Sequence, residues 1–140
     1  MAVGRVTARH SIRSPVRRFT VVIALLAAGC GGDDGDDAPA RSVTIPANGE
    51  LRVVAKEYSF DPANVVVRGA GRLELTLANQ GSLAHNLKLL RGGEEVGGTP
   101  SFPAGRTEAA IVNVEHGTYE MVCTVGDHAE LGMRGKLEVK

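Results

Sequence analysis

The chain contains 140 residues, with 16 basic and 16 acidic side chains, and its formal net charge at pH 7 is zero. This length predicts a single domain. Domains that bind nucleic acid carry a clustered basic surface, so the balanced charge argues against nucleic acid as a partner.

The first 29 residues have the pattern of a signal peptide. Residues 1–18 contain five arginines and no acidic residue, and residues 19–29 form an apolar run of eleven. A membrane-spanning helix needs about 20 apolar residues, so this run is too short to cross a bilayer. A basic segment followed by a short apolar segment is typical of a cleaved export signal, and we therefore expect an exported protein.

A cysteine follows the apolar run directly. The segment Leu26-Ala27-Ala28-Gly29-Cys30 resembles the lipobox of bacterial lipoproteins, although Ala27 stands where that family prefers leucine. The resemblance implies that Cys30 becomes the first residue of the mature protein and carries lipid. The protein would then be anchored at the outer face of the cytoplasmic membrane or in the periplasm. Plain secretion, with cleavage near Ala28–Gly29 and a free Cys30, is the alternative.

Residues 30–41 predict a flexible acidic linker, because their Gly, Asp and Pro residues cannot bury a core. The folded domain is therefore expected at 42–140. From residue 41 to the end of the chain there are 11 basic and 12 acidic side chains. Such a neutral domain offers little electrostatic steering, so a partner protein should dock on an apolar face.

Apolar and polar residues alternate with a period of two along most of the domain, which is typical of half-buried strands. Residues 92–106 are rich in Gly and Pro and predict a long loop instead. Short strands separated by turn residues predict an all-β sandwich or barrel. The expected strands are 42–45, 51–58, 64–68, 72–78, 86–91, 107–114, 118–123 and 134–139.

Four side chains form a candidate metal site. Cys123, His128 and Met133 lie in one loop with the spacing C-x4-H-x4-M, and His85 lies in a separate turn. Two imidazoles, one thiolate and one thioether are the ligands of a blue-copper electron-transfer site. The soft sulfur ligands suit Cu(I), while imidazoles suit both oxidation states. Each of these residues taken alone would more often be an ordinary core or turn residue.

Several motifs resemble those of cupredoxins, the small blue copper proteins, and the spacing of the ligand loop resembles the rusticyanin and sulfocyanin branch. This resemblance implies a Greek-key β-sandwich of about seven or eight strands. It also implies one type 1 copper ion, with His85, Cys123 and His128 in a trigonal plane and Met133 as a weak axial ligand. The motifs are Tyr58-Ser-Phe60-Asp-Pro62, Asn79-Gln-Gly81, Gly117-Thr-Tyr119-Glu-Met-Val-Cys123 and Met133-Arg-Gly135-Lys136.

The resemblance assigns supporting roles to neighbouring residues. Asn86 matches the position that hydrogen-bonds toward the residue after the cysteine, here Thr124. Asp127 stands where the family commonly has glycine, and its carboxylate should favour Cu(II) unless Arg134 neutralises it. In the family an apolar rim around the second histidine receives redox partners. The corresponding residues here are Leu83, Ala129 and Leu131.

We therefore expect an exported carrier that shuttles single electrons between redox partner proteins through Cu(II)/Cu(I). Copper delivery, storage or sensing is the alternative. An enzymatic role is disfavoured, because multicopper enzymes need further histidines and dinuclear centres need a second cysteine in the loop. Only three histidines follow the signal segment. A monomer is the default expectation, with the membrane reached only through lipid on Cys30.

Overall fold

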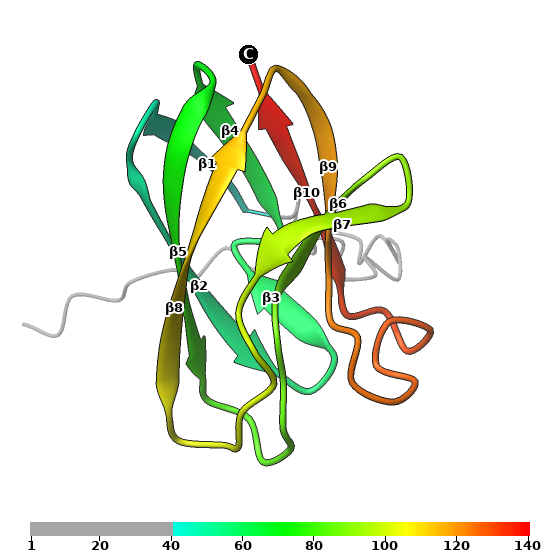
Figure 1. The fold of residues 1–140 in the computed structure, drawn as a ribbon. Helices are drawn as coiled ribbons and strands as arrows, with labels where there is room; N and C mark the ends of the chain where they lie inside the picture. Colours follow the sequence, from blue (N-terminus) through cyan, green and yellow to red (C-terminus); the bar gives the residue numbers. More distant parts are fainter. Residues whose placement is uncertain (1–40) are drawn as a thin grey trace, which may run out of the picture. The chain divides into compact units, whose positions relative to one another are not determined.

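The computed structural model describes residues 41–140, which form two β-sheets packed face to face (Figure 1). The predicted signal peptide, Cys30 and nearly all of the predicted linker lie outside the described residues. Within residues 41–140 we find no helix of the length and apolarity that crossing a membrane requires.

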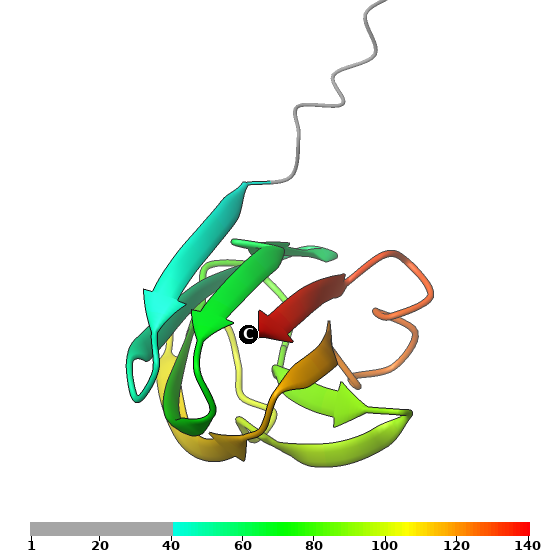
Figure 2. The same ribbon diagram turned by 90° about the horizontal axis from the view of Figure 1, so that it is seen from above.

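The larger sheet has six strands in the order β1-β4-β10-β9-β6-β7, and the smaller has four in the order β3-β2-β5-β8. The β1/β4, β4/β10 and β2/β5 pairs are parallel, and the other neighbouring pairs are antiparallel. Figure 2 shows the two layers from above. The strands are β1 Ser42–Pro46, β2 Glu50–Lys56, β3 Ser59–Asp61, β4 Asn64–Arg68, β5 Gly71–Asn79, β6 Lys88–Arg91, β7 Glu94–Gly98, β8 Thr107–Val114, β9 Gly117–Val122 and β10 Arg134–Val139.

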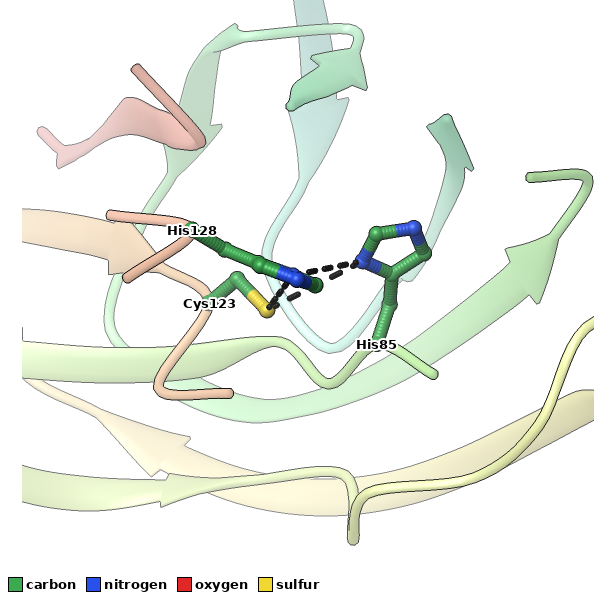
Figure 3. A group of neighbouring side chains, drawn as sticks. All are labelled: His85, Cys123 and His128. Atoms are coloured by element: carbon green, nitrogen blue, oxygen red, sulfur yellow. Dashed lines mark hydrogen bonds between the residues drawn. The ribbon is translucent and has the colours of Figure 1, made fainter. Parts of the chain in front are cut away.

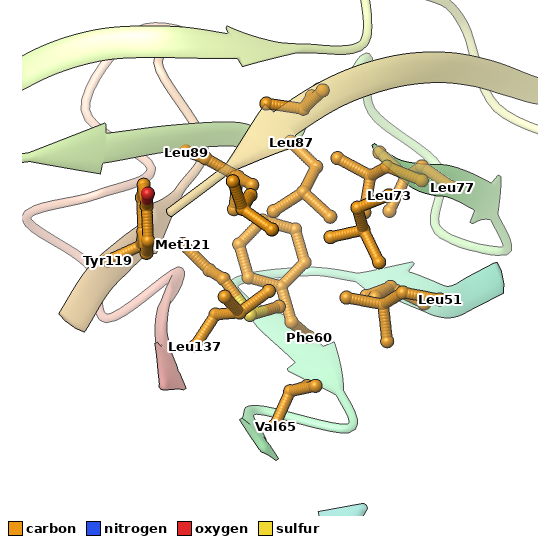
Figure 4. Close-up of a cluster of buried hydrophobic side chains, with 14 of the residues drawn as sticks. Leu51, Phe60, Val65, Leu73, Leu77, Leu87, Leu89, Tyr119, Met121 and Leu137 are labelled. Atoms are coloured by element: carbon orange, nitrogen blue, oxygen red, sulfur yellow. The ribbon is translucent and has the colours of Figure 1, made fainter. Parts of the chain in front are cut away.

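The core lies between the sheets and follows the alternation in the sequence. Leu73 and Leu77 of β5 are buried, and the intervening Glu74 faces solvent. Met121 of β9 and Leu137 of β10 are buried on the facing sheet (Figure 4). Removing apolar side chains from water is the main favourable contribution to folding, at about 25 cal/mol per Å².

A tyrosine fixes the start of β9, the strand that leads into the ligand loop. The Tyr119 hydroxyl accepts a hydrogen bond from the Glu115 backbone N–H at 2.8 Å and donates to the Glu115 carbonyl at 3.1 Å. The Arg91 guanidinium lies 5.7 Å from the centre of the Tyr119 ring. Such tyrosine corners hold the chain as it crosses between sheets of a β-sandwich. Tyr119 therefore helps to fix where β9 delivers Cys123.

The predicted all-β sandwich is confirmed, with ten strands in place of seven or eight. The predicted strand 51–58 was too long, because β2 ends at Lys56 and a two-residue turn, Glu57–Tyr58, leads into β3. The predicted loop 92–106 was wrong in its first part. There Gly92 and Gly93 adopt φ of 60° and 89°, and β7 then pairs with β6. As an edge strand with no fully buried residue, β7 lacks the apolar alternation that marks the other strands.

Replacing a core leucine should cost far more stability than replacing an exposed apolar residue. Leu137→Ala removes a fully buried side chain, so we expect a loss of about 2–5 kcal/mol in the free energy of unfolding. Ile111→Ala is the matched control, because Ile111 is 57% exposed and its loss should change stability by less than about 0.5 kcal/mol. Urea unfolding of both variants checks this, and equal losses would contradict the assigned core.

Candidate metal centre

Three buried side chains converge at one end of the sandwich (Figure 3). His85 lies between β5 and β6, where its backbone N–H and carbonyl both pair with Phe102 at 3.1 Å. Cys123 directly follows β9, and His128 lies in the loop between β9 and β10. The predicted ligands on these separate segments are therefore brought together by the fold.

The donor atoms lie within a few tenths of an ångström of the separations found around a single metal ion. The two Nδ1 atoms of His85 and His128 are 3.2 Å apart. The Cys123 Sγ lies 4.0 Å from Nδ1 of His85 and 3.6 Å from Nδ1 of His128. With metal–N bonds of about 2.0 Å and metal–S bonds of about 2.3 Å, donors around one ion lie about 3.3–3.8 Å apart. The residues present thus fit a metal, and their two imidazoles and one thiol match a type 1 copper site.

The ligand loop is closed by its own backbone hydrogen bonds. The Met133 N–H donates to the His128 carbonyl at 2.9 Å, and the Cys123 N–H donates to the Met133 carbonyl at 3.2 Å. The His128 N–H donates to the Val125 carbonyl at 3.1 Å. Met133 is fully buried and belongs to the hydrophobic core. The structure therefore places Met133 next to two of the converging residues, through main-chain contacts that side-chain substitutions leave in place.

Burial keeps the site dry and favours the neutral form of His85. His85 and Cys123 are 0% exposed, and His128 is 7% exposed. Burial lowers the pKa of His85, because the charged imidazolium loses its hydration. A neutral imidazole keeps one ring nitrogen with a free lone pair, which is the form that binds a metal.

Asn86 and Thr124 join the strand segments that carry His85 and Cys123. The Asn86 side-chain amide donates to the Thr124 hydroxyl at 2.9 Å, and its carbonyl oxygen accepts from the Thr124 backbone N–H at 2.8 Å. The Asn86 side chain thus links the two segments through both its amide NH2 group and its carbonyl oxygen. This is the pair that the family resemblance singled out.

Sequence reasoning missed the turn Glu57–Tyr58. The Glu57 Oε1 lies 3.5 Å from the His85 Nε2, and the Tyr58 ring packs edge-on against His128 at a centroid distance of 5.1 Å. Backbone N–H groups of Ser82 and Leu83 donate to Glu57 and lower the pKa of its carboxyl to about 2, so it is ionised at neutral pH. The sequence carries no signal for this, because Glu57 and His85 meet only through the pairing of distant segments.

Asp127 lies beside His128 in sequence, and its side chain is exposed to solvent. Arg134 forms its ion pair with Glu120 and donates from Nε to the Ala129 carbonyl at 3.0 Å. The guanidinium thus binds a different carboxylate from the one that the sequence suggested it would neutralise. Because Asp127 is exposed, water and salt weaken the effect of its charge on the site.

The predicted docking residues are on the surface near the ligand segments. Leu83 is 42% and Leu131 50% exposed, and both are among the few large apolar side chains that the described part of the chain leaves exposed. Ala129 is half-buried, and the adjacent His128 is 7% exposed.

Removing the Asn86 link should loosen the centre. Asn86→Ala deletes two hydrogen bonds, so the metal-free protein should lose about 1–3 kcal/mol of unfolding free energy. Copper affinity should fall by about 10–100-fold, as for other residues that orient ligands. Denaturant unfolding and chelator competition measure the two effects. Asn113→Ala, on the exposed face of β8, is the control and should change neither.

No protein-family model and no curated protein matches the chain. Among solved structures it resembles reduced auracyanin from Roseiflexus castenholzii, with a TM-score of 0.63 and 19% identity over 67% of this chain and 98% of that one. Auracyanin A from Chloroflexus aurantiacus, a "blue" copper protein, has a TM-score of 0.60 and 21% identity over 69% of this chain and 100% of that one. Rusticyanin from Thiobacillus ferrooxidans has a TM-score of 0.55 and 22% identity over 69% of this chain and 82% of that one. Together with the sandwich described above, these likenesses show that the chain has the cupredoxin fold.

Proposed function

We propose that this protein is an exported type 1 blue copper protein that shuttles single electrons between redox partners. The observation that carries the proposal is the convergence of two imidazole Nδ1 atoms and one thiol within 3.2–4.0 Å in a buried site. His85, Cys123 and His128 would hold the ion, and Met133 would be its axial ligand. When bound, copper supplies the one-electron Cu(II)/Cu(I) chemistry.

The chain's contribution is to hold the ligands still. His85 is fixed by its pairing with Phe102, and Cys123 by the end of β9. The Asn86–Thr124 link ties these two segments together. An electron carrier benefits from ligands that move little between oxidation states, and ligands held by strand ends and main-chain hydrogen bonds meet that requirement.

The slightly exposed His128 is the proposed route for electrons. It lies in the same loop as Leu131 and Ala129, and Leu83 precedes His85 by two residues. These apolar side chains would form the docking face for an electron donor or acceptor. Transient redox encounters need only small interfaces, and the near-neutral charge of the domain favours apolar contact over electrostatic steering.

Burial of the ligands favours the carrier over copper delivery, storage or sensing. A delivery protein must exchange its ion with a partner's ligands, so its donors should be accessible. Here two of the three converging residues are fully buried and the third is 7% exposed. The proposed anchor at Cys30 and the linker that follows it would keep such a carrier close to membrane-bound partners.

The thiolate should give the copper-loaded protein its colour. With Cu(II), we expect an intense visible absorption band that ascorbate bleaches reversibly and that Cys123→Ser abolishes, because the band arises from the copper–thiolate bond. Absorption spectroscopy of the two proteins checks this. Tight copper binding with no such band, unaffected by Cys123→Ser, would contradict electron transfer and favour copper handling.

The axial residue should set the reduction potential. Met133→Leu removes the weak axial donor and leaves three ligands, a lower coordination number that Cu(I) accepts more readily than Cu(II), so the potential measured by redox titration should rise while the visible band remains. Met121→Leu is a matched control, because Met121 is equally buried but lies within β9, outside the ligand loop. Equal shifts in the two variants would rule out the axial role of Met133.

A further inference from the structure

We propose that the turn Glu57–Tyr58, between β2 and β3, is a positioning clamp that holds both imidazoles of the metal centre. In this assignment Glu57 fixes the ring orientation and tautomer of His85, and Tyr58 braces the ring of His128. The inference rests on the proposed copper site and adds two residues that touch the ligands from outside the ligand loops.

The Glu57 carboxylate is built into the segment that leads to His85. Its Oε1 accepts the Ser82 N–H at 2.5 Å, the Leu83 N–H at 3.0 Å and the Ser82 hydroxyl at 3.3 Å. A nearby backbone hydrogen bond also joins these two segments: the Gln80 N–H donates to the Ala55 carbonyl of β2 at 2.9 Å. One oxygen of Glu57 therefore organises residues 82–83, two positions before the ligand.

The same oxygen faces the outer nitrogen of His85. The His85 Nδ1 is turned toward Cys123 and His128, and its Nε2 lies 3.5 Å from the Glu57 Oε1. This Nε2 is fully buried and has no hydrogen-bond partner among the described residues. When Nδ1 binds a metal, a neutral ring must carry its proton on Nε2. An ionised carboxylate is an acceptor only, so Glu57 favours that tautomer and leaves Nδ1 free.

Gly81 makes the approach of Glu57 to His85 possible. A Cβ at this position would collide with the Glu57 Oε1 and would lie 2.9 Å from the His85 Nε2. The backbone of Gly81 does not adopt a left-handed conformation, so alanine there would not strain φ but would force the Glu57 carboxylate or the His85 ring to shift. Glycine at position 81 therefore leaves the space in which the Glu57 carboxylate and the His85 imidazole approach each other.

Tyr58 contacts the other imidazole from the second position of the turn. Its ring meets the His128 ring at 5.1 Å and 72°, an edge-to-face arrangement, and it packs on the hydrophobic core. Tyr58 adopts φ of 37°, a conformation that bulky residues rarely occupy. Asparagine or glycine would suit this backbone better, so the side-chain contact with His128 gives a reason for tyrosine here.

The clamp connects the two sheets at the metal end. Glu57 and Tyr58 follow β2 of the four-stranded sheet, whereas Cys123 and His128 follow β9 of the six-stranded sheet. His85 lies on the connection from one sheet to the other. A turn that touches both imidazoles therefore limits how far the sheets can shift relative to each other around the ion.

The tautomer gives a test that does not depend on electron transfer. In the Zn(II)-loaded protein, nitrogen NMR should show the His85 proton on Nε2 with slow exchange. Glu57→Ala should make this proton exchange fast and should weaken Cu(II) binding by about 10–100-fold in chelator competition. Glu57→Gln should largely restore both, because the amide oxygen can still accept. Glu94→Ala, which removes an equal charge from the exposed strand β7, should change neither.

Two further variants keep the test decisive if Glu57→Ala disturbs folding. Gly81→Ala keeps the Glu57 carboxylate in the protein but displaces it from its contact with His85, so it should also speed exchange of the Nε2 proton. Tyr58→Asn removes the ring contact with His128 at a turn that asparagine tolerates, so it should alter the visible spectrum of the Cu(II) form. These changes would support the clamp.

Unchanged Nε2 protection, copper affinity and spectrum in all three variants would overturn the clamp and leave the copper site itself intact. A wild-type protein that bound neither Zn(II) nor Cu(II) would instead overturn the proposed function, and the clamp with it. The two failures are thus distinguishable from the behaviour of the wild-type protein alone.

Discussion

The convergence of two imidazole Nδ1 atoms on one buried thiol is the constraint on which the rest of the structure depends. Nitrogen lone pairs 3.2 Å apart in a dry site repel each other unless a shared proton or a cation lies between them. The hydrogen bonds around the site keep the two Nδ1 atoms close together and do not let them move apart. The Asn86–Thr124 link, the Met133 main-chain bonds and the Phe102 pairing fix the segments that carry the donors. The fold thus holds the donor atoms in an arrangement that suits a bound metal ion.

Much of this arrangement could be predicted from the sequence, because local patterns encode it. Alternation in β5, β9 and β10 identifies the buried face, and that face carries Cys123 at the end of β9. The spacing of His128 and Met133 after the cysteine identifies the ligand loop. These features depend on residues near one another in the chain, so periodicity and spacing are sufficient to find them.

The remainder depends on contacts between distant segments or on residues without a pattern. β7 has no buried apolar side, so nothing distinguishes it from a loop until it pairs with β6. Glu57 meets His85 only after β2 and β5 lie side by side, because the two residues are far apart in the sequence. Arg134 pairs with Glu120 across β9 and β10, because the register places Arg134 opposite Val122 and near that strand's outer face. Each of these contacts depends on which residues of neighbouring strands lie opposite one another, and local sequence patterns do not determine that register.

The most direct test of the central claim is a crystal structure of the copper-loaded protein. We predict one copper ion bonded to Nδ1 of His85, Nδ1 of His128 and Sγ of Cys123, with these side chains close to the positions described here. The His85 Nε2 should face Glu57. Copper bound elsewhere on the chain, or held through the outer nitrogens of the imidazoles, would contradict a preformed site and with it the proposed electron carrier.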